Sequence, residues 1–136
     1  MYGSCRAPAI AALLVGLISL LPAPASAMDL TGVWASQGDL CKMAFTKKGN
    51  EVVFAELSDL YGSGFIIDGN RIAKAVECTT NSKKQSGDMI ELNASCTSTI
   101  TTQNASFLLK VIDDNNFARV IPEIENMEIR YTRCRM

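Results

Sequence analysis

Cysteine is the residue type with the clearest chemical meaning in this 136-residue chain. Four of its five cysteines, Cys41, Cys78, Cys96 and Cys134, are well spaced along the part of the chain that we expect to fold. An even number of spaced cysteines in an exported chain predicts two disulfides. A metal site is the competing interpretation, and it is weak because the sequence has no C-x-x-C pair and no histidine.

The absence of histidine also narrows the catalytic chemistry. Neither a Ser-His-Asp nor a Cys-His arrangement can form without it, and cysteines paired in disulfides offer no thiolate nucleophile. Two pairs of carboxylates are close in sequence: Glu56 with Asp59, and Glu123 with Glu125. Nothing around them predicts the burial that would shift a pKa for acid–base catalysis. We therefore expect a non-catalytic protein that needs no cofactor and no metal.

Tyr61-Gly62-Ser63-Gly64 is the candidate for a binding loop. Glycines that flank a serine beside an aromatic ring could form an exposed loop on a rigid scaffold. The alternative is a bulge or bend that leads into the next strand, and we favour this structural role. The segment is not a G-x-S-x-G nucleophile elbow.

The first 27 residues have the pattern of a cleaved signal peptide. A cationic start is followed by the apolar run Ile10–Leu21, by Pro22, and by the small-residue cleavage motif Ala25-Ser26-Ala27. The run is too short for a transmembrane helix, which needs roughly 20 residues, and Met28 stands where a lipoprotein would have cysteine. We expect residues 28–136 to form one domain without a membrane span, in the periplasm or outside the cell, after Cys5 is removed.

Charge excludes one class of partner. The chain has 13 Lys and Arg against 14 Asp and Glu, and Arg6 is the only charged residue in the signal peptide. Nucleic-acid binding needs a clustered basic excess that releases counterions from the phosphates. We expect the pairs Lys47-Lys48 and Lys83-Lys84 to be solvated turn residues. The partner is therefore a protein or a small ligand, which the sequence does not identify, and not a nucleic acid.

The elements that must position these residues are short strands. Within the expected strand Met89–Thr97, apolar and polar residues alternate from Ile90 onward, as expected of a strand with one buried face. Turn residues separate similar runs at a spacing near ten residues, which predicts an all-β fold: a small antiparallel up-and-down barrel of about eight strands. The other expected strands are Leu30–Ala35, Lys42–Thr46, Val52–Leu57, Gly64–Ile67, Arg71–Thr79, Ser106–Ile112, Phe117–Ile121 and Met127–Cys134.

The connections have recognisable turn chemistry. Lys48-Gly49-Asn50 and Asp68-Gly69-Asn70 predict tight hairpins, because Gly and Asn tolerate positive φ. Asp113–Asn116 predicts a further turn, Ser82–Asp88 a longer polar loop, and Gln37–Leu40 one helical turn.

The segment Leu30-Thr31-Gly32-Val33-Trp34 resembles the L-x-G-x-W opening of lipocalin-like and avidin-like barrels. The resemblance implies that Trp34 packs across the barrel floor and that Gly32 lets the first strand bend. With Cys41 shortly afterwards, the stretch from Leu30 to about Phe45 also resembles small exported proteins of Gram-negative bacteria. One such group is the periplasmic metalloprotease inhibitors, whose N-terminal segment enters the protease cleft. This chain departs from that group in having four cysteines, and its remainder resembles uncharacterised exported barrels.

Strand geometry constrains the disulfide pairing. If Arg71–Thr79 and Asp88–Thr97 form one hairpin around the polar loop, Cys78 faces about residue 89 and lies too far from Cys96 for a bridge. Counting strand directions then places Cys41, Cys78 and Cys134 at one end of the barrel and Cys96 at the other. Two disulfides cannot satisfy that arrangement, so at least one expected strand boundary must be wrong.

Two functions are compatible with such a domain. A protein-interaction module, such as a hydrolase inhibitor, predicts a filled interior and a protruding loop or N-terminal segment. A binding protein for a small apolar or amphipathic ligand predicts an internal cavity of about 300 Å³ or more. The modest number of large apolar residues in a short chain favours a filled core, and therefore the interaction module.

Overall fold

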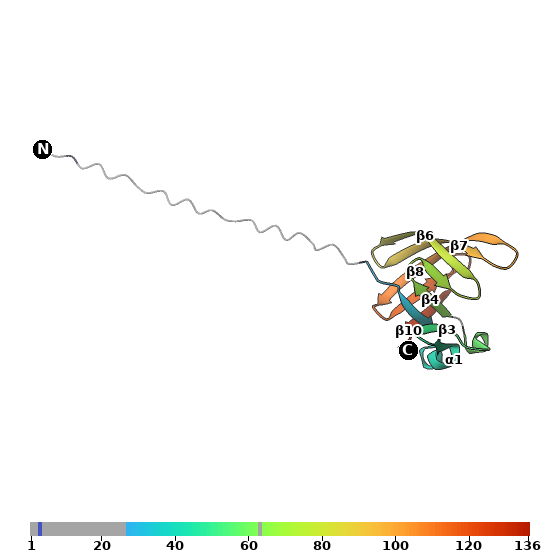
Figure 1. Ribbon diagram of the computed structural model, residues 1–136. Coiled ribbons are helices and arrows are strands. Elements are labelled where there is room, and N and C mark those ends of the chain that lie inside the picture. The colour runs from blue at the N-terminus through green and yellow to red at the C-terminus, as the bar shows by residue number, and fades with distance from the viewer. Residues whose placement is uncertain (1–2, 4–26, 63) are drawn as a thin grey trace.

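Short alternating strands close into an eight-stranded antiparallel barrel in the computed structural model of the chain (Figure 1). The structure describes Gly3, residues 27–62 and residues 64–136. The signal peptide predicted over residues 1–27 thus lies outside the described residues, apart from Gly3 and Ala27. The barrel strands are β1 (Gly32–Ala35), β4 (Gly64–Asp68), β5 (Arg71–Ala73), β6 (Glu77–Ser86), β7 (Met89–Thr97), β8 (Thr102–Asp113), β9 (Asn116–Val120) and β10 (Glu128–Arg133).

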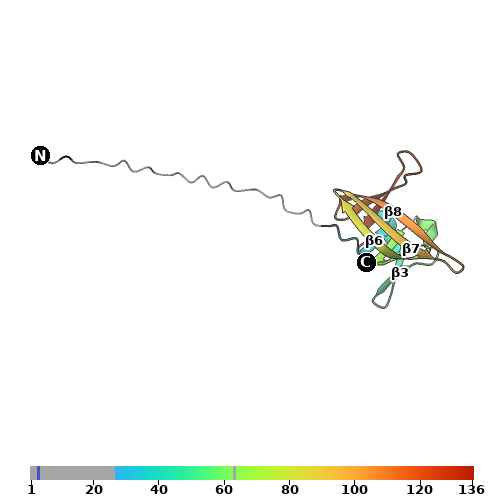
Figure 2. The ribbon, with the colours of Figure 1, turned by 90° about the horizontal axis from the view of Figure 1, so that it is seen from above.

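A small outer layer is inserted between β1 and β4. It consists of the 3-10 helices η1 (Gly38–Leu40) and η2 (Ser58–Tyr61), the helix α1 (Cys41–Ala44), and the hairpin of β2 (Phe45–Lys48) and β3 (Glu51–Phe54). Figure 2 shows this hairpin projecting from the barrel wall. None of the helices in the described part of the chain has the length and apolar character that a membrane-spanning helix needs.

The strands are connected up and down, as predicted. Their order around the barrel is β1-β10-β9-β8-β7-β6-β5-β4, and each neighbouring pair is antiparallel. Strand β1 completes the ring, because Trp34 pairs with Phe65 of β4 and with Arg133 of β10. Closure leaves no barrel strand with a free edge. We call the end at which β1 begins and β10 ends the floor, and the end at which β1 ends and β10 begins the mouth.

Aromatic side chains fill the interior. The ring centroid of Phe65 lies 4.9 Å from that of Tyr131, 6.1 Å from Phe107 and 6.4 Å from Phe117. Phe117 in turn lies 4.7 Å from Trp34, which has no exposed surface. The space left between these rings and the neighbouring aliphatic side chains is about 10 Å³. That is room for at most one water molecule, in agreement with the expected filled core.

A second apolar cluster lies outside the barrel wall, under the outer layer. Phe45 is almost completely buried there with Ala44, against the outward-facing side chains of β1, β4 and β5. Gly64 makes this close packing possible. A Cβ atom at Gly64 would lie 2.6 Å from Cζ of Phe45 and 2.7 Å from the carbonyl oxygen of Trp34. Phe45 therefore anchors the outer layer in close contact with the barrel wall at Gly64.

The two predicted disulfides are confirmed, and one of them fastens the outer layer. Cys41 in α1 is bonded to Cys134, which directly follows β10, across a separation of 93 residues. The strand predicted over Lys42–Thr46 is wrong in its first half, because residues 41–44 form α1. A helix of four residues is too short to show a 3.6-residue periodicity. The helical turn predicted over Gln37–Leu40 is present as η1.

The second disulfide joins Cys78 to Cys96, the pairing that strand geometry had disfavoured. That prediction was wrong for two reasons. Arg71–Thr79 is not one strand, because the chain turns at residues 74–76 between β5 and β6. The polar segment Ser82–Asp88 is mostly not a loop, because β6 runs on to Ser86. The hairpin therefore turns at residues 87–88, and Cys78 lies directly opposite Cys96, with a Cα–Cα distance of 3.9 Å.

Candidate functional site

The two ends of the barrel differ in how their polar groups are satisfied. At the floor, the guanidinium of Arg133 lies 4.2 Å from the ring centroid of Trp34. This guanidinium donates hydrogen bonds to the carbonyl oxygens of Thr31, of Asp29 at 2.9 Å, and of Asp114 at 3.1 and 3.3 Å. The cation over the aromatic ring thus has its donors occupied by backbone acceptors.

The residues predicted for the floor lie at this end. The indole Nε1 of Trp34 donates a 2.8 Å hydrogen bond to the carbonyl of Leu30. Gly32 has φ of +144°, and a Cβ atom there would lie 2.7 Å from Nη1 of Arg133. Glycine at this position allows both the unusual backbone conformation and the close approach of the arginine.

The segment before β1 is packed into the floor. Met28 and Leu30 are buried in the interior cluster. The amide of Met28 donates to Oε1 of Gln85 at 3.0 Å, and Nζ of Lys83 donates to the carbonyl of Met28 at 2.7 Å. Lys83 was predicted to lie in a turn with Lys84, and both residues instead belong to β6. Residues 28–31 are therefore not a projecting arm that could enter the cleft of a partner.

Two cations occupy the mouth. Nζ of Lys74, just after β5, lies 5.4 Å from the ring centroid of Phe65. The guanidinium of Arg119, on β9, lies 5.1 Å from the ring centroid of Phe107. Burial, with a smaller contribution from the charge of nearby Arg119, lowers the pKa of Lys74. Neither residue stands out in the sequence, because only barrel closure brings β5 and β9 to the same aromatic cluster.

The candidate loop Tyr61-Gly62-Ser63-Gly64 lies beside Lys74. Tyr61 ends η2, Gly64 begins β4, and Ser63 lies outside the described residues. Gly62 has φ of +92°, and a Cβ atom there would lie 2.6 Å from Oγ of Ser36. The local structure therefore favours glycine at Gly62, as the close approach of Phe45 does at Gly64. They also line a groove of about 750 Å³, together with Ala44, Phe54, Ser58, Asp59, Lys74 and Ala75.

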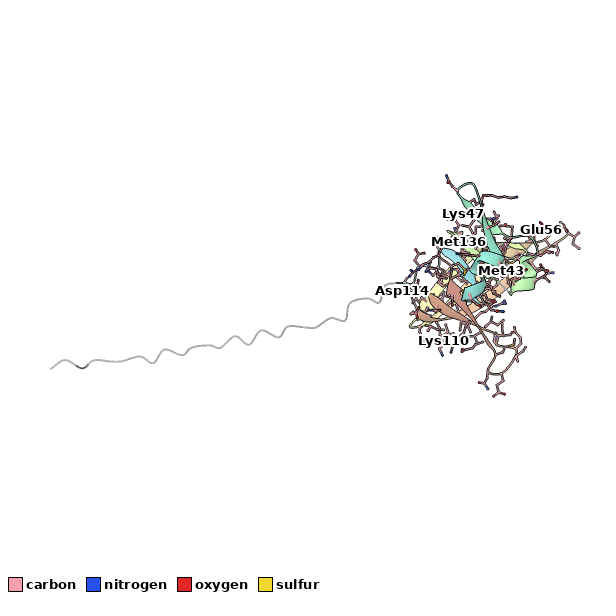
Figure 3. The ribbon with its side chains drawn as sticks, turned by 90° about the horizontal axis from the view of Figure 1, so that it is seen from below. Met43, Lys47, Glu56, Lys110, Asp114 and Met136 are labelled. Carbon is pink, nitrogen blue, oxygen red and sulfur yellow. A yellow bond between two sulfur atoms is a disulfide. The ribbon has the colours of Figure 1, made fainter. Side chains whose placement is uncertain are left out.

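The connections at the mouth carry most of the exposed large apolar side chains. Seven of the nine large apolar side chains that are exposed in the described chain belong to segments joining strands at this end. Leu60 is 69% exposed and Ile100 is 92% exposed. Figure 3 shows Met43 at the surface of the outer layer, and Figure 2 shows the loop between β9 and β10 projecting from the barrel. The seven residues are Met43, Leu57, Leu60, Val76, Ile100, Ile124 and Met127, which we call the mouth rim.

The carboxylate pairs considered for catalysis do not form a site in this structure. Glu56, Asp59, Glu123 and Glu125 are all exposed, and Figure 3 shows Glu56 pointing away from the domain. Within residues 27–62 and 64–136, no group of three or more acidic or cysteine side chains is arranged to hold a metal ion.

Comparison of the chain with protein-family models, with curated proteins and with solved structures finds no match.

Proposed function

We propose that this protein is an exported, non-catalytic interaction module that binds a protein partner through the mouth rim. A hydrolase that it inhibits is the partner class implied by the resemblance to periplasmic metalloprotease inhibitors. The predicted signal peptide and the two disulfides support a periplasmic or secreted location, where disulfides persist.

The observation that carries the proposal is the contrast between a filled interior and an apolar rim. The space among the interior rings is about 10 Å³, and the hollow at the floor that reaches Ile67, Ile72 and Leu92 is about 100 Å³, both smaller than the roughly 300 Å³ expected for an internal ligand site. Water is a poor solvent for the exposed apolar side chains of the mouth rim, and exposed apolar surface that collects in one place is typical of interaction sites. Because Met28 and Leu30 are buried, we assign recognition to the loops and not to residues 28–31.

The experiment compares capture by three forms of the protein. The wild type, the rim variant Leu60→Ser/Ile100→Ser/Ile124→Ser and the control Ile112→Ser are immobilised, and periplasmic and extracellular fractions of the source organism are passed over each. Ile112 is the matched control because it is exposed but lies at the floor end of β8. We expect a hydrolase that is retained by the wild type and the control, lost by the rim variant, and inhibited by purified wild-type protein.

Two results would contradict the proposal. One is equal retention of the captured hydrolase by the rim variant. The other is recovery of no hydrolase, together with a lipid-like molecule that stays bound in native mass spectrometry, which would favour the ligand-binding alternative.

A further inference from the structure

Three cationic side chains of the described residues are half-buried: Arg133 at the floor, and Lys74 and Arg119 at the mouth. Each lies over an aromatic ring of the interior. Only Arg133 has acceptors, the backbone carbonyls described above. The Nζ of Lys74 and the guanidinium of Arg119 make no hydrogen bond and no ion pair with any described residue. A cation thus lies over an aromatic ring at both ends of the barrel, but only at the floor does that cation also have hydrogen-bond acceptors.

Lys74 and Arg119 lie over two rings, Phe65 and Phe107, whose centroids are 6.1 Å apart, and like charges placed in this way disfavour each other. An anion bound between the two cations would relieve that repulsion. A carboxylate is suited to this role, because its two oxygens can accept one charge-assisted hydrogen bond from an ammonium and another from a guanidinium. None of the described carboxylates pairs with Lys74 or Arg119 in this way. Asp59 lines the groove beside Lys74, and Glu91 and Glu123 line the hollow beside Arg119, yet none lies within ion-pair distance of either cation.

The groove beside Lys74 supplies an apolar surface next to this charge. Its walls include Ala44 and Phe54 of the outer layer and Ala75 of the turn after β5. Its volume of about 750 Å³ lies within the range of small-molecule sites, about 300–1,000 Å³. A ligand with a carboxylate head and a short apolar chain would match both the two cations and the groove.

We infer that Lys74 and Arg119, together with the groove beside Lys74, bind a small amphipathic carboxylate at the mouth of the barrel. The head group accepts hydrogen bonds from both cations, and the apolar chain lies along Phe54 and Ala44. This site is separate from the filled interior, and the inference does not depend on the protein partner proposed above.

Octanoate is the probe that tests the site, titrated into the protein below its micelle concentration and followed by amide chemical shifts in NMR. We expect shifts centred on the mouth. Acetate, which lacks the chain, and octan-1-ol, which lacks the charge, should each bind more weakly. Replacing either cation, in Lys74→Met or Arg119→Met, should weaken octanoate binding by about 10- to 100-fold, the usual effect of losing a charge-assisted hydrogen bond.

Two further variants separate binding from folding. Lys84→Met removes an exposed lysine of β6 and should leave octanoate binding unchanged, whereas Lys74→Arg keeps the positive charge and should retain most of it. Unfolding midpoints measured alongside show whether a variant that loses binding is still folded. The inference is overturned if octan-1-ol binds as tightly as octanoate, if the shifts lie away from the mouth, or if folded Lys74→Met and Arg119→Met bind octanoate like the wild type. The cations would then only cover the aromatic rings.

Discussion

The two disulfides offer a quantitative test of how this small barrel is stabilised. A disulfide restricts the unfolded chain more strongly when the loop that it closes is longer. Cys41–Cys134 spans 93 residues and Cys78–Cys96 spans 18. The chain-entropy relation then gives stabilisations of about 4.6 and about 3.2 kcal/mol, respectively. We therefore expect Cys41→Ala/Cys134→Ala to lose about 1.5 kcal/mol more unfolding free energy than Cys78→Ala/Cys96→Ala.

The comparison is well matched, because each pair contains one buried and one half-buried cysteine, so that the two double variants lose similar sulfur packing. Trp34 is the only tryptophan and is fully buried, so its fluorescence reports urea unfolding of the barrel. The slope of unfolding free energy against urea should also rise in both variants, because a less constrained denatured chain exposes more surface. Equal losses, or a larger loss for the short-loop pair, would refute the entropic reasoning. If the urea midpoint followed by Trp34 fluorescence is the same in Cys41→Ala/Cys134→Ala as in the wild type, this disulfide stabilises only the outer layer and not the barrel.

Three further predictions concern single residues. Gly64→Ala should lower the unfolding free energy by about 1–3 kcal/mol, because its Cβ would collide with Phe45 and with the Trp34 backbone, and urea unfolding of this variant tests the value. Burial lowers the pKa of Lys74, so folding favours the neutral amine. Stability should therefore rise with pH between the lowered pKa and the unfolded value, and thermal unfolding of Lys74→Met should show a weaker rise. Hydrogen bonds from the Asn116 side chain and the Asn115 amide lower the pKa of Asp113, so its contribution to stability is present at neutral pH and is lost as pH falls below about 4. Unfolding of Asp113→Asn across that range should show a smaller acid dependence than the wild type.

The strand whose bounds were predicted best is the one whose side chains alternate clearly between the core and the solvent. Residues Met89–Thr97 form β7 over their whole predicted length, and Ile90, Leu92 and Ala94 point inward. The preceding strand β6 was predicted only in part, because most of its residues from Asn81 to Ser86 are exposed. A strand segment without a buried face has no alternation to detect, and a run of polar residues then looks like a loop.

The placement of Lys74 and Arg119 at the mouth could not have been predicted from sequence spacing, for a different physical reason. Lys74 follows a strand of three residues and Arg119 stands near the end of β9, positions at which a charged residue is ordinarily solvated. Their significance depends on Phe65 and Phe107, which face each other across the interior only when the barrel closes. Local sequence patterns report which face of a strand is buried, but not which strands meet across the ring.

The distribution of hydrogen bonds and burial supports the proposal that binding takes place at the mouth and not at the floor. Arg133 connects β10 to the segment before β1 and to the turn between β8 and β9, and Trp34 packs beneath it. Opening the floor would therefore break contacts that join three separate parts of the chain. At the mouth, the cations have no described acceptor and the apolar side chains of the rim have little cover. Segments with few such contacts open and rearrange at low cost, as ligand-binding loops must. In the proposed function, the closed floor would hold the barrel rigid while the loops of the mouth adapt to a partner.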